Sequence, residues 1–403
     1  LGIAVSASGY ATCDKTDIDT SDDWTATTQQ AKVQASDVEA NDYFGHTVDI
    51  SGDTMVAGAY LEDTGGSNAG AAYVLTRSGT SWSQQAKIQS SDIAEGDKFG
   101  YAVAIDGDTI VVGAYGEDTG GSNAGAAYVF TRSGTSWSQQ AKLVASDAAA
   151  DDRFGHRVAI GGDTIVVGAY NENIQGAAYV FTRSGTTWSQ QAKLVASNRG
   201  GSDRFGQFVA IDSDTVVVGA NYEDTAASDA GSAYVFTRSG TSWSQQAIIQ
   251  ASDAAASDLF GHSVAIDGDT VVVGVGNGRA VALAGAAYVF TRSGTSWSQQ
   301  AKIQSSDIAA SDLFGNSVAI EGDTVVVGAH AEADGGTNAG AAYVFTRSGT
   351  SWTQAKKLVA SDAQANDYFG ISVAIDDDTV VAGAYLEDTG AAQSGAAYTF
   401  IAG

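Results

Sequence analysis

The sequence predicts an all-β protein, a seven-bladed β-propeller made of four-stranded antiparallel blades. Two observations lead to this prediction. A Phe-Gly pair recurs seven times at spacings of 51 to 55 residues, and four short β-branched or aromatic runs follow in each unit. The pair begins at Phe44, Phe99, Phe154, Phe205, Phe260, Phe314 and Phe369, which mark the expected blade starts. Four-stranded units in this number are typical of a closed propeller.

The unit at residues 99–142 predicts four strands in order. Residues 99–105 place Phe, Tyr, Val and Ile on one face and Gly and Ala on the other, the two-residue period of a pleated strand. Residues 109–115 are almost wholly apolar, as expected of a strand buried on both faces. Residues 126–132 again oppose large side chains to small ones, and residues 137–142 form the most polar strand.

Short turns join these strands into a meander. Asp106-Gly107-Asp108 leaves room only for a hairpin, and Gly107 can supply a positive φ there. Each blade then has one bulky face and one small-residue face. A single such sheet cannot bury both faces, whereas stacked copies bury a continuous core.

The arrangement of the chain ends predicts how the ring closes. A fourth strand over residues 24–33 precedes the first Phe-Gly pair, and the chain ends in a third strand, residues 396–401. The N-terminal strand is therefore expected to join the last blade, since an open ring would expose sheet edges. Residues 23–403 form one propeller domain in this interpretation, with 23–36 completing the last blade.

Residues 1–22 form an N-terminal arm outside the repeat. Leu1 to Ala11 is small and apolar without a basic leader, so we interpret it as a mature start or the remnant of a secretion signal. Cys13 is the single cysteine, which excludes an internal disulfide. A free thiol, an intermolecular bond and a lipid attachment point stay open.

The composition disfavours some classes of binding partner. Forty-seven acidic residues against twenty basic ones give a formal net charge of −27, which argues against nucleic acid and anionic membrane. The chain has no apolar run long enough for a membrane helix, so we expect no membrane insertion. These features predict a secreted or cell-surface protein, or one that collects cations.

The acidic residues gather in two loops of each blade. The lead-in loop before Phe-Gly carries two Asp five residues apart in six blades, with Asn198 and Asp203 as the exception. The loop between the second and third strands often adds Glu-Asp. Both loops of a meander blade lie on one rim, which is therefore acidic; the Thr-Arg-Ser-Gly turns lie on the opposite rim. The aspartates either cap turns and tie blades together or form a ring of divalent-cation sites with calcium as the candidate ion. The candidate metal ligands are Asp92, Asp97, Glu117 and Asp118.

Loops that break the repeat are the candidate ligand-binding residues. Residues 275–283 replace the Glu-Asp pair with Asn277, Arg279 and small apolar residues, and the sixth blade places His330 and Glu332 in the same loop. A discrete partner is expected to break the sevenfold symmetry in this way. Ordinary drift of loop sequences explains these changes equally well.

The sequence gives little support for an enzyme. His46, His156 and His262 follow Phe-Gly at equivalent positions, where other blades carry Tyr, Gln, Asn or Ile. This exchange indicates packing rather than a catalytic base. No nucleophile elbow, zinc pattern or phosphate loop is present. A glycosidase or lyase on the central axis is the enzymatic alternative.

The run FG-x-x-VAI-x-x-D-T-VVVGA followed by GAAYVF resembles the FG-GAP repeat, the unit of the seven-bladed head of integrin α subunits. The resemblance extends from about Asp23 to the end and implies a propeller that binds or adheres outside the cell. Two features depart from the family. Gly-Ala-Tyr, as at Ala114-Tyr115, replaces Gly-Ala-Pro, and the family's calcium loop between strands one and two is absent. Asp106-Gly107-Asp108 is too short to hold calcium.

Three functions follow from these observations. The first is a non-enzymatic extracellular scaffold for adhesion or binding, whose partner is a protein or a glycan. The second is a structural subunit that assembles with copies of itself through the N-terminal arm. The third is a lectin in which Tyr60, Tyr115, Tyr170 and Tyr385 stack on sugars.

Overall fold

The computed structural model describes residues 23–276 and 284–403. The N-terminal arm with Cys13, and the candidate ligand-binding residues Asn277 and Arg279, lie outside the described residues.

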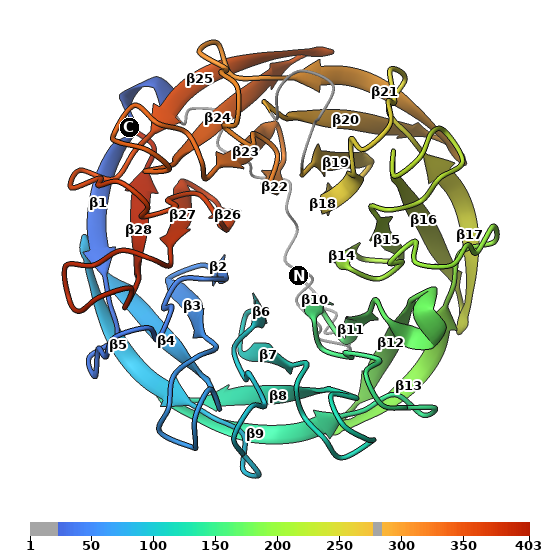
Figure 1. Cartoon of the computed structure of the whole chain (residues 1–403), viewed down its shortest axis with the longest axis horizontal. Coiled ribbons are helices and arrows are strands. Elements are labelled where there is room, and N and C mark those ends of the chain that lie inside the picture. Colours follow the sequence, from blue (N-terminus) through green and yellow to red (C-terminus); the bar gives the residue numbers. More distant parts are fainter. Residues whose placement is uncertain (1–22, 277–283) are drawn as a thin grey trace, which may run out of the picture.

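Seven four-stranded antiparallel sheets surround a central axis, with one strand of each sheet on the inside and one on the perimeter (Figure 1). The seven-bladed all-β prediction is confirmed. The innermost strands are β2 (Val48–Ser51), β6 (Ala102–Asp106), β10 (Arg157–Gly161), β14 (Phe208–Asp212), β18 (Phe260–Asp267), β22 (Ser317–Glu321) and β26 (Val373–Asp376). The second strands are β3 (Thr54–Ala59), β7 (Thr109–Ala114), β11 (Thr164–Ala169), β15 (Thr215–Ala220), β19 (Thr270–Val275), β23 (Thr324–Ala329) and β27 (Thr379–Ala384).

The third strands are β4 (Ala71–Ser78), β8 (Ala126–Ser133), β12 (Ala177–Ser184), β16 (Ser232–Ser239), β20 (Ala286–Ser293), β24 (Ala341–Ser348) and β28 (Ala396–Ile401). The outermost strands are β5 (Ser81–Ile88), β9 (Ser136–Leu143), β13 (Thr187–Leu194), β17 (Ser242–Ile249), β21 (Ser296–Ile303), β25 (Ser351–Leu358) and β1 (Thr28–Val33). Two 3₁₀ turns, η1 (Trp24–Ala26) and η2 (Glu172–Ile174), complete the described elements. None of the described helices is long and apolar enough to cross a membrane.

The first strand is shorter than predicted in every blade except the fifth, where β18 begins at Phe260 as predicted. In the second blade it begins at Ala102 rather than Phe99, and Phe99 instead forms a parallel bridge to Gly70 of the preceding blade. Gly100 has a φ of +89°, and a Cβ on it would lie 2.1 Å from the Ala71 carbonyl oxygen. The Phe-Gly pair therefore clamps one blade to its neighbour. The hairpin prediction is confirmed, since Gly107 has a φ of +54°.

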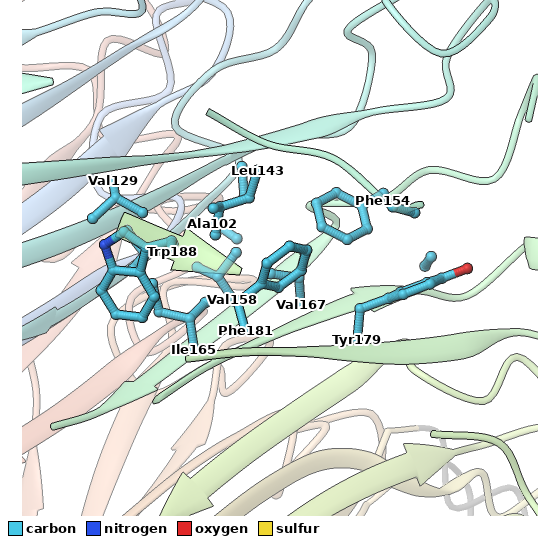
Figure 2. Close-up of a cluster of buried hydrophobic side chains, with 14 of the residues drawn as sticks. Ala102, Val129, Leu143, Phe154, Val158, Ile165, Val167, Tyr179, Phe181 and Trp188 are labelled. Atoms are coloured by element: carbon cyan, nitrogen blue, oxygen red, sulfur yellow. The ribbon is translucent and has the colours of Figure 1, made fainter. Parts of the chain in front are cut away.

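Neighbouring blades pack with the bulky face of one against the small face of the other, as predicted. Phe154, Tyr179 and Phe181 of the third blade lie in one buried cluster with Val129 and Leu143 of the second (Figure 2). The Phe154 and Phe181 rings meet edge to face, with centroids 5.9 Å apart. An equivalent cluster spans each junction, so the core forms a continuous ring.

A glycine in every second strand lets two backbones touch. A Cβ on Gly113 would lie 1.9 Å from the Gly155 carbonyl oxygen of the next blade. Glycines at the same place in the other blades meet the next blade at 1.9 to 2.1 Å. The repeated Val-Gly-Ala is thus required by inter-blade contact.

The N-terminal strand closes the ring. β1 pairs antiparallel with β28, from Thr28 opposite Ile401 to Val33 opposite Ala397. The strand begins later than predicted, because Trp24 lies in the 3₁₀ turn η1. The Asp23 side chain caps this turn by accepting a hydrogen bond from the Thr25 N–H. Trp24 is only 3% exposed and packs in the cluster between the sixth and seventh blades.

Deletion of residues 1–36 is expected to destabilise the protein strongly, because it removes a whole strand from the last blade. Loss of the buried Trp24 side chain alone costs about 3–5 kcal/mol. Thermal unfolding followed by circular dichroism measures this loss. A deletion of residues 1–22, which keeps β1, serves as the control. Equal melting temperatures for the full chain and the 1–36 deletion would contradict closure by β1.

Gly113→Ala is expected to destabilise the protein by about 1–3 kcal/mol, because the added methyl group forces two blade backbones apart. Gly107→Ser is the control, since a Cβ on Gly107 meets nothing within 4 Å and Ser213 occupies the same turn position in the fourth blade. Denaturant unfolding of both variants measures the difference. Equal midpoints would show that the close backbone approach carries no energetic cost.

Candidate functional site

Within the described part of the chain, the two acidic loops meet at a lysine in five of the seven blades. Lys142 Nζ lies 2.7 Å from Asp92 Oδ2 and 2.8 Å from Glu117 Oε1. This confirms that the two loops share a rim. Burial alone would raise the pKa of Asp92, but the hydrogen bond and charge of Lys142 together with the Tyr128 hydroxyl outweigh this effect and hold the pKa below its usual value. The lysines that contact both loops are Lys32, Lys87, Lys142, Lys193 and Lys357, whereas among the described residues Lys302 of the fifth blade pairs only with Asp253.

The other two candidate metal ligands hold the backbone of their own loops. Asp97 Oδ2 accepts a hydrogen bond of 2.8 Å from the Ala94 N–H, and burial raises its pKa to about 6. Asp118 Oδ1 accepts a hydrogen bond of 2.8 Å from the Asn123 N–H. Among the described residues, no three His, Cys, Asp or Glu side chains are arranged to hold a metal ion. Calcium binding stays a prediction.

The fourth blade shows how the lysine and the first aspartate depend on each other. Asn198 stands in place of the aspartate and Ile248 in place of the lysine. Asn198 Nδ2 donates to Glu223 Oε1 at 3.0 Å, so an amide replaces the ammonium group. This joint change was the signal in the sequence that the lysines belong to the acidic rim.

The opposite rim joins blades through arginine. Arg132 Nε donates to Asp108 Oδ1 at 2.6 Å, and the same guanidinium reaches Thr54 of the preceding blade at 2.8 Å. The tryptophan side chains cross the junctions in a similar way: Trp137 Nε1 donates to Gln85 Oε1 at 2.8 Å. The polar side chains that recur around the ring thus form contacts that hold the blades together.

Lys142→Ile is expected to cost about 1–3 kcal/mol of stability, because Glu117 stays buried without its cation. Adding Asp92→Asn is expected to recover more than half of the loss, because the amide can donate to Glu117 as Asn198 does to Glu223. Urea unfolding of the two single variants and the double variant gives the coupling energy. Strictly additive losses would contradict this exchange.

A different set of residues surrounds the axis on the acidic side of the ring. The innermost strands enclose an axial cavity of about 490 Å³. One end of the cavity is lined by the residue that follows Phe-Gly in each blade. The residue that precedes Phe-Gly and the residue that follows the second strand lie next to this lining, as Tyr60 does against His46. We call this region the axial mouth.

Aromatic rings form a continuous arc around much of the axial mouth. Neighbouring members contact one another with centroid distances of 4.5 to 5.8 Å. The arc runs in order through His330, Tyr368, Tyr385, Tyr43, Tyr60, Tyr101, Tyr115, His156 and Tyr170. Its tyrosines are partly exposed. The structure therefore brings together the four tyrosines predicted for sugar stacking, and Asn221 and Gly276 interrupt the series in the fourth and fifth blades.

Four cations lie among these rings in the second, third and fourth blades. Lys98 Nζ lies 5.7 Å from the ring centroids of both Tyr60 and Tyr115. The Arg157 guanidinium lies 4.7 Å from the Phe208 ring centroid. Arg153 donates to the Tyr170 hydroxyl at 2.6 Å, and Arg204 lies 4.1 Å from the Tyr222 ring. We call Lys98, Arg153, Arg157 and Arg204 the mouth cations.

The mouth cations form no ion pair with any carboxylate of the described chain, unlike the repeated lysines and arginines of the two rims. Burial, with the neighbouring charge of Arg153, lowers the pKa of Lys98. Burial is also the main cause that lowers the pKa of His46 to about 3 and of His262 to about 4, and the Arg157 charge adds to both shifts. The mouth is thus locally positive in a strongly acidic protein.

Several buried polar atoms at the mouth have no hydrogen-bond partner within the described chain. They are His46 Nδ1, Arg153 Nε, His156 Nδ1, Gln207 Oε1, Asn221 Oδ1, His262 Nδ1 and His330 Nδ1. His156 and Asn221 are only 7% and 1% exposed. Buried polar atoms are usually satisfied, so this concentration at one opening indicates a place for polar ligand groups.

The structure separates the two described candidate ligand residues of the sixth blade. His330 belongs to the aromatic arc, 5.6 Å from Tyr368, and burial lowers its pKa to about 4. Glu332 instead lies in the acidic rim, where Lys357 Nζ is 3.1 Å from its Oε1. Sequence reasoning missed the mouth cations. The signal was the residue before Phe-Gly, which changes from Tyr to Lys, Arg and Leu around the ring.

Comparison with known proteins agrees with the repeat structure. The profile of the FG-GAP repeat matches residues 27–75, 82–130, 137–181, 188–236, 243–290, 297–345 and 352–400. No curated protein matches the sequence significantly. Among solved structures 538 chains match, so the fold is too widespread to specify a ligand. One of them, from a crystal structure of the mitotic checkpoint complex, aligns over 100% of this chain and 98% of its own with a TM-score of 0.57 and 12% identity. This likeness concerns the fold alone.

Proposed function

The chain belongs to the FG-GAP repeat family, and from this we propose that it is a non-enzymatic binding propeller that takes its ligand at the axial mouth. The observation that carries the proposal is the break in symmetry there. The carboxylates and cations of the two rims are satisfied by one another in blade after blade, whereas the mouth joins unpaired cations, partly exposed rings and unpartnered polar atoms in one place.

The chemistry of the mouth favours binding over catalysis. Its histidines have a lowered pKa and pack against tyrosine rings, as His46 does against Tyr60 with centroids 4.6 Å apart. A catalytic base works best with a pKa near the operating pH, and a neutral, buried imidazole is far from that. Two carboxylates with opposite pKa shifts do occur on the acidic rim, but both have structural partners there. Asp92, with a lowered pKa, pairs with Lys142, and Asp97, with a raised pKa, accepts a hydrogen bond from the Ala94 N–H.

We place the protein outside the cell, in a role of adhesion or recognition. FG-GAP repeats are typical of extracellular and cell-surface proteins. The net charge of −27 supports solubility in salt and disfavours nucleic acid and anionic membrane as partners. Self-assembly through the N-terminal arm stays a prediction, because the arm lies outside the described residues.

A lectin is the form of this function that a specific observation favours. The aromatic arc presents partly exposed tyrosines around an axial cavity of about 490 Å³, within the range of small-ligand sites. Stacked or edge-on rings with a few polar groups are well suited to the apolar faces and hydroxyl groups of a sugar.

The proposal is tested by screening the purified chain against arrays of glycans and extracellular proteins, with Tyr60→Ala and Tyr101→Ala as mouth variants. Binding that falls about tenfold or more in both variants supports the axial mouth as the ligand site. Ile174→Ala is the control, because Ile174 is 67% exposed in a rim loop outside the arc. Binding that is unchanged in the mouth variants would contradict the proposal.

A further inference from the structure

We propose that the axial mouth binds a sugar that carries an oxyanion, either a carboxylate or a sulfate group, at the end of a glycan. The inference rests on the proposed function and names the class of ligand. The mouth cations hold the anionic group, and the tyrosines of the arc contact the sugar ring.

The first argument is the distribution of positive charge. Nearly all other described lysines and arginines are paired with carboxylates, although acidic residues outnumber basic ones by 47 to 20. The exception outside the mouth is Lys356, which donates to the Thr25 carbonyl oxygen on the perimeter. Four cations without a carboxylate partner within three adjacent blades, in a chain so rich in carboxylates, indicate a site that pairs with an anion from outside the chain. The one carboxylate that lines the cavity on β2, Asp49, is buried and accepts hydrogen bonds from the backbone N–H groups of Ile50 and Ile105.

The second argument is the position of the cationic groups relative to the axial cavity. Arg157 lines the axial cavity, and its charge lowers the pKa of histidines in three blades, His46, His156 and His262. From its position on β10 the guanidinium therefore acts on the mouth residues of the first, third and fifth blades, as a smaller effect than burial. Arg153 keeps a buried Nε without a partner while its other arm donates to Tyr170. A guanidinium with a free N–H suits the oxygens of a carboxylate or sulfate.

The third argument separates a sugar from a simple anion. On the side opposite the cations the arc offers Tyr43, Tyr368 and Tyr385, which contact no mouth cation. Gln207 Oε1 and Asn221 Oδ1 are unpartnered acceptors next to the cations. Acceptors do not suit a bare anion, but they suit the hydroxyl groups of the sugar that bears it.

The fourth argument limits the length of the anionic ligand. The acidic rim surrounds the mouth with exposed carboxylates such as Asp63, Asp118 and Asp224. A polyanion that crossed this rim would meet like charges at every blade. A single acidic sugar at a chain end reaches the cations without crossing the rim, so we place the terminal residue at the axis.

The test is calorimetric titration of the full chain with D-glucuronic acid, galactose 6-sulfate and, as the neutral comparison, D-glucose. We expect one or both acidic sugars to bind and glucose to bind at least about tenfold more weakly. Arg157→Gln and Arg153→Gln are each expected to weaken the acidic sugar by about tenfold or more, the usual effect of losing a charged hydrogen bond. Lys356→Gln removes the same charge at the perimeter and is expected to leave binding unchanged. Melting curves confirm that each variant is folded.

The outcomes separate the anion, the sugar and the site. Binding of the carboxylate alone or the sulfate alone supports the proposal and identifies the group. If acetate or an aspartate-rich peptide binds with the same affinity as glucuronic acid, the claim that the ligand is a sugar is wrong. If glucose binds with the same affinity as the acidic sugars, and Tyr60→Ala abolishes this binding, the claim that the ligand is anionic is wrong. The proposed function as a binding propeller would then still stand. No binding of either acidic sugar at ~20 mM, where millimolar ligands saturate, would overturn the inference.

Discussion

Backbone contact between neighbouring blades is the constraint on which the rest of the structure depends. Gly113 and its equivalents leave no room for a side chain, so each second strand lies directly against the Phe-Gly turn of the next blade. Around this contact the large aromatic face of one sheet fills the small-residue face of the other. Because every junction needs a partner on both sides, the stack is complete only when β1 joins β28.

Seven equal junctions also explain most of the polar residues. Lysine on the acidic rim, arginine on the opposite rim and tryptophan on the perimeter each connect a blade to its own loops or to a neighbour. The amide of Asn198 beside Ile248 in the fourth blade shows that the contact is kept even when its charges are exchanged. A large negative charge on this chain is thus in good part a structural device, and the acidic loops alone do not specify a ligand.

The residues of the axial mouth differ from blade to blade, unlike those of the junctions. The innermost strands are short and converge on the axis, so the residues next to Phe-Gly from all blades come close together. The residue before Phe-Gly contacts the preceding blade through its backbone N–H, as Lys98 does with the Asn68 carbonyl oxygen. Its side chain is not needed for this hydrogen bond, so a substitution there keeps the junction. This position is therefore free to carry Tyr43, Lys98 or Arg153 in different blades, and a ring of equal repeats acquires one face with a positive side and an aromatic side.

The repeat itself determined the blade number, the antiparallel meander, the hairpin at Gly107 and the closing strand, since these depend on local spacing and hydrophobic period. The tertiary structure decided what the spacing could not. The sequence predicted Phe-Gly as the start of a strand, whereas in the structure it holds two blades together. The reason is that the backbone of the neighbouring blade fills the space where a Cβ on Gly100 would lie. The tertiary structure also placed Lys142 between Asp92 and Glu117, and it gathered Arg153, Arg157 and Arg204 at one opening. Residues about 50 positions apart in the chain become neighbours only when the ring closes. Their contacts therefore cannot be predicted from local sequence patterns.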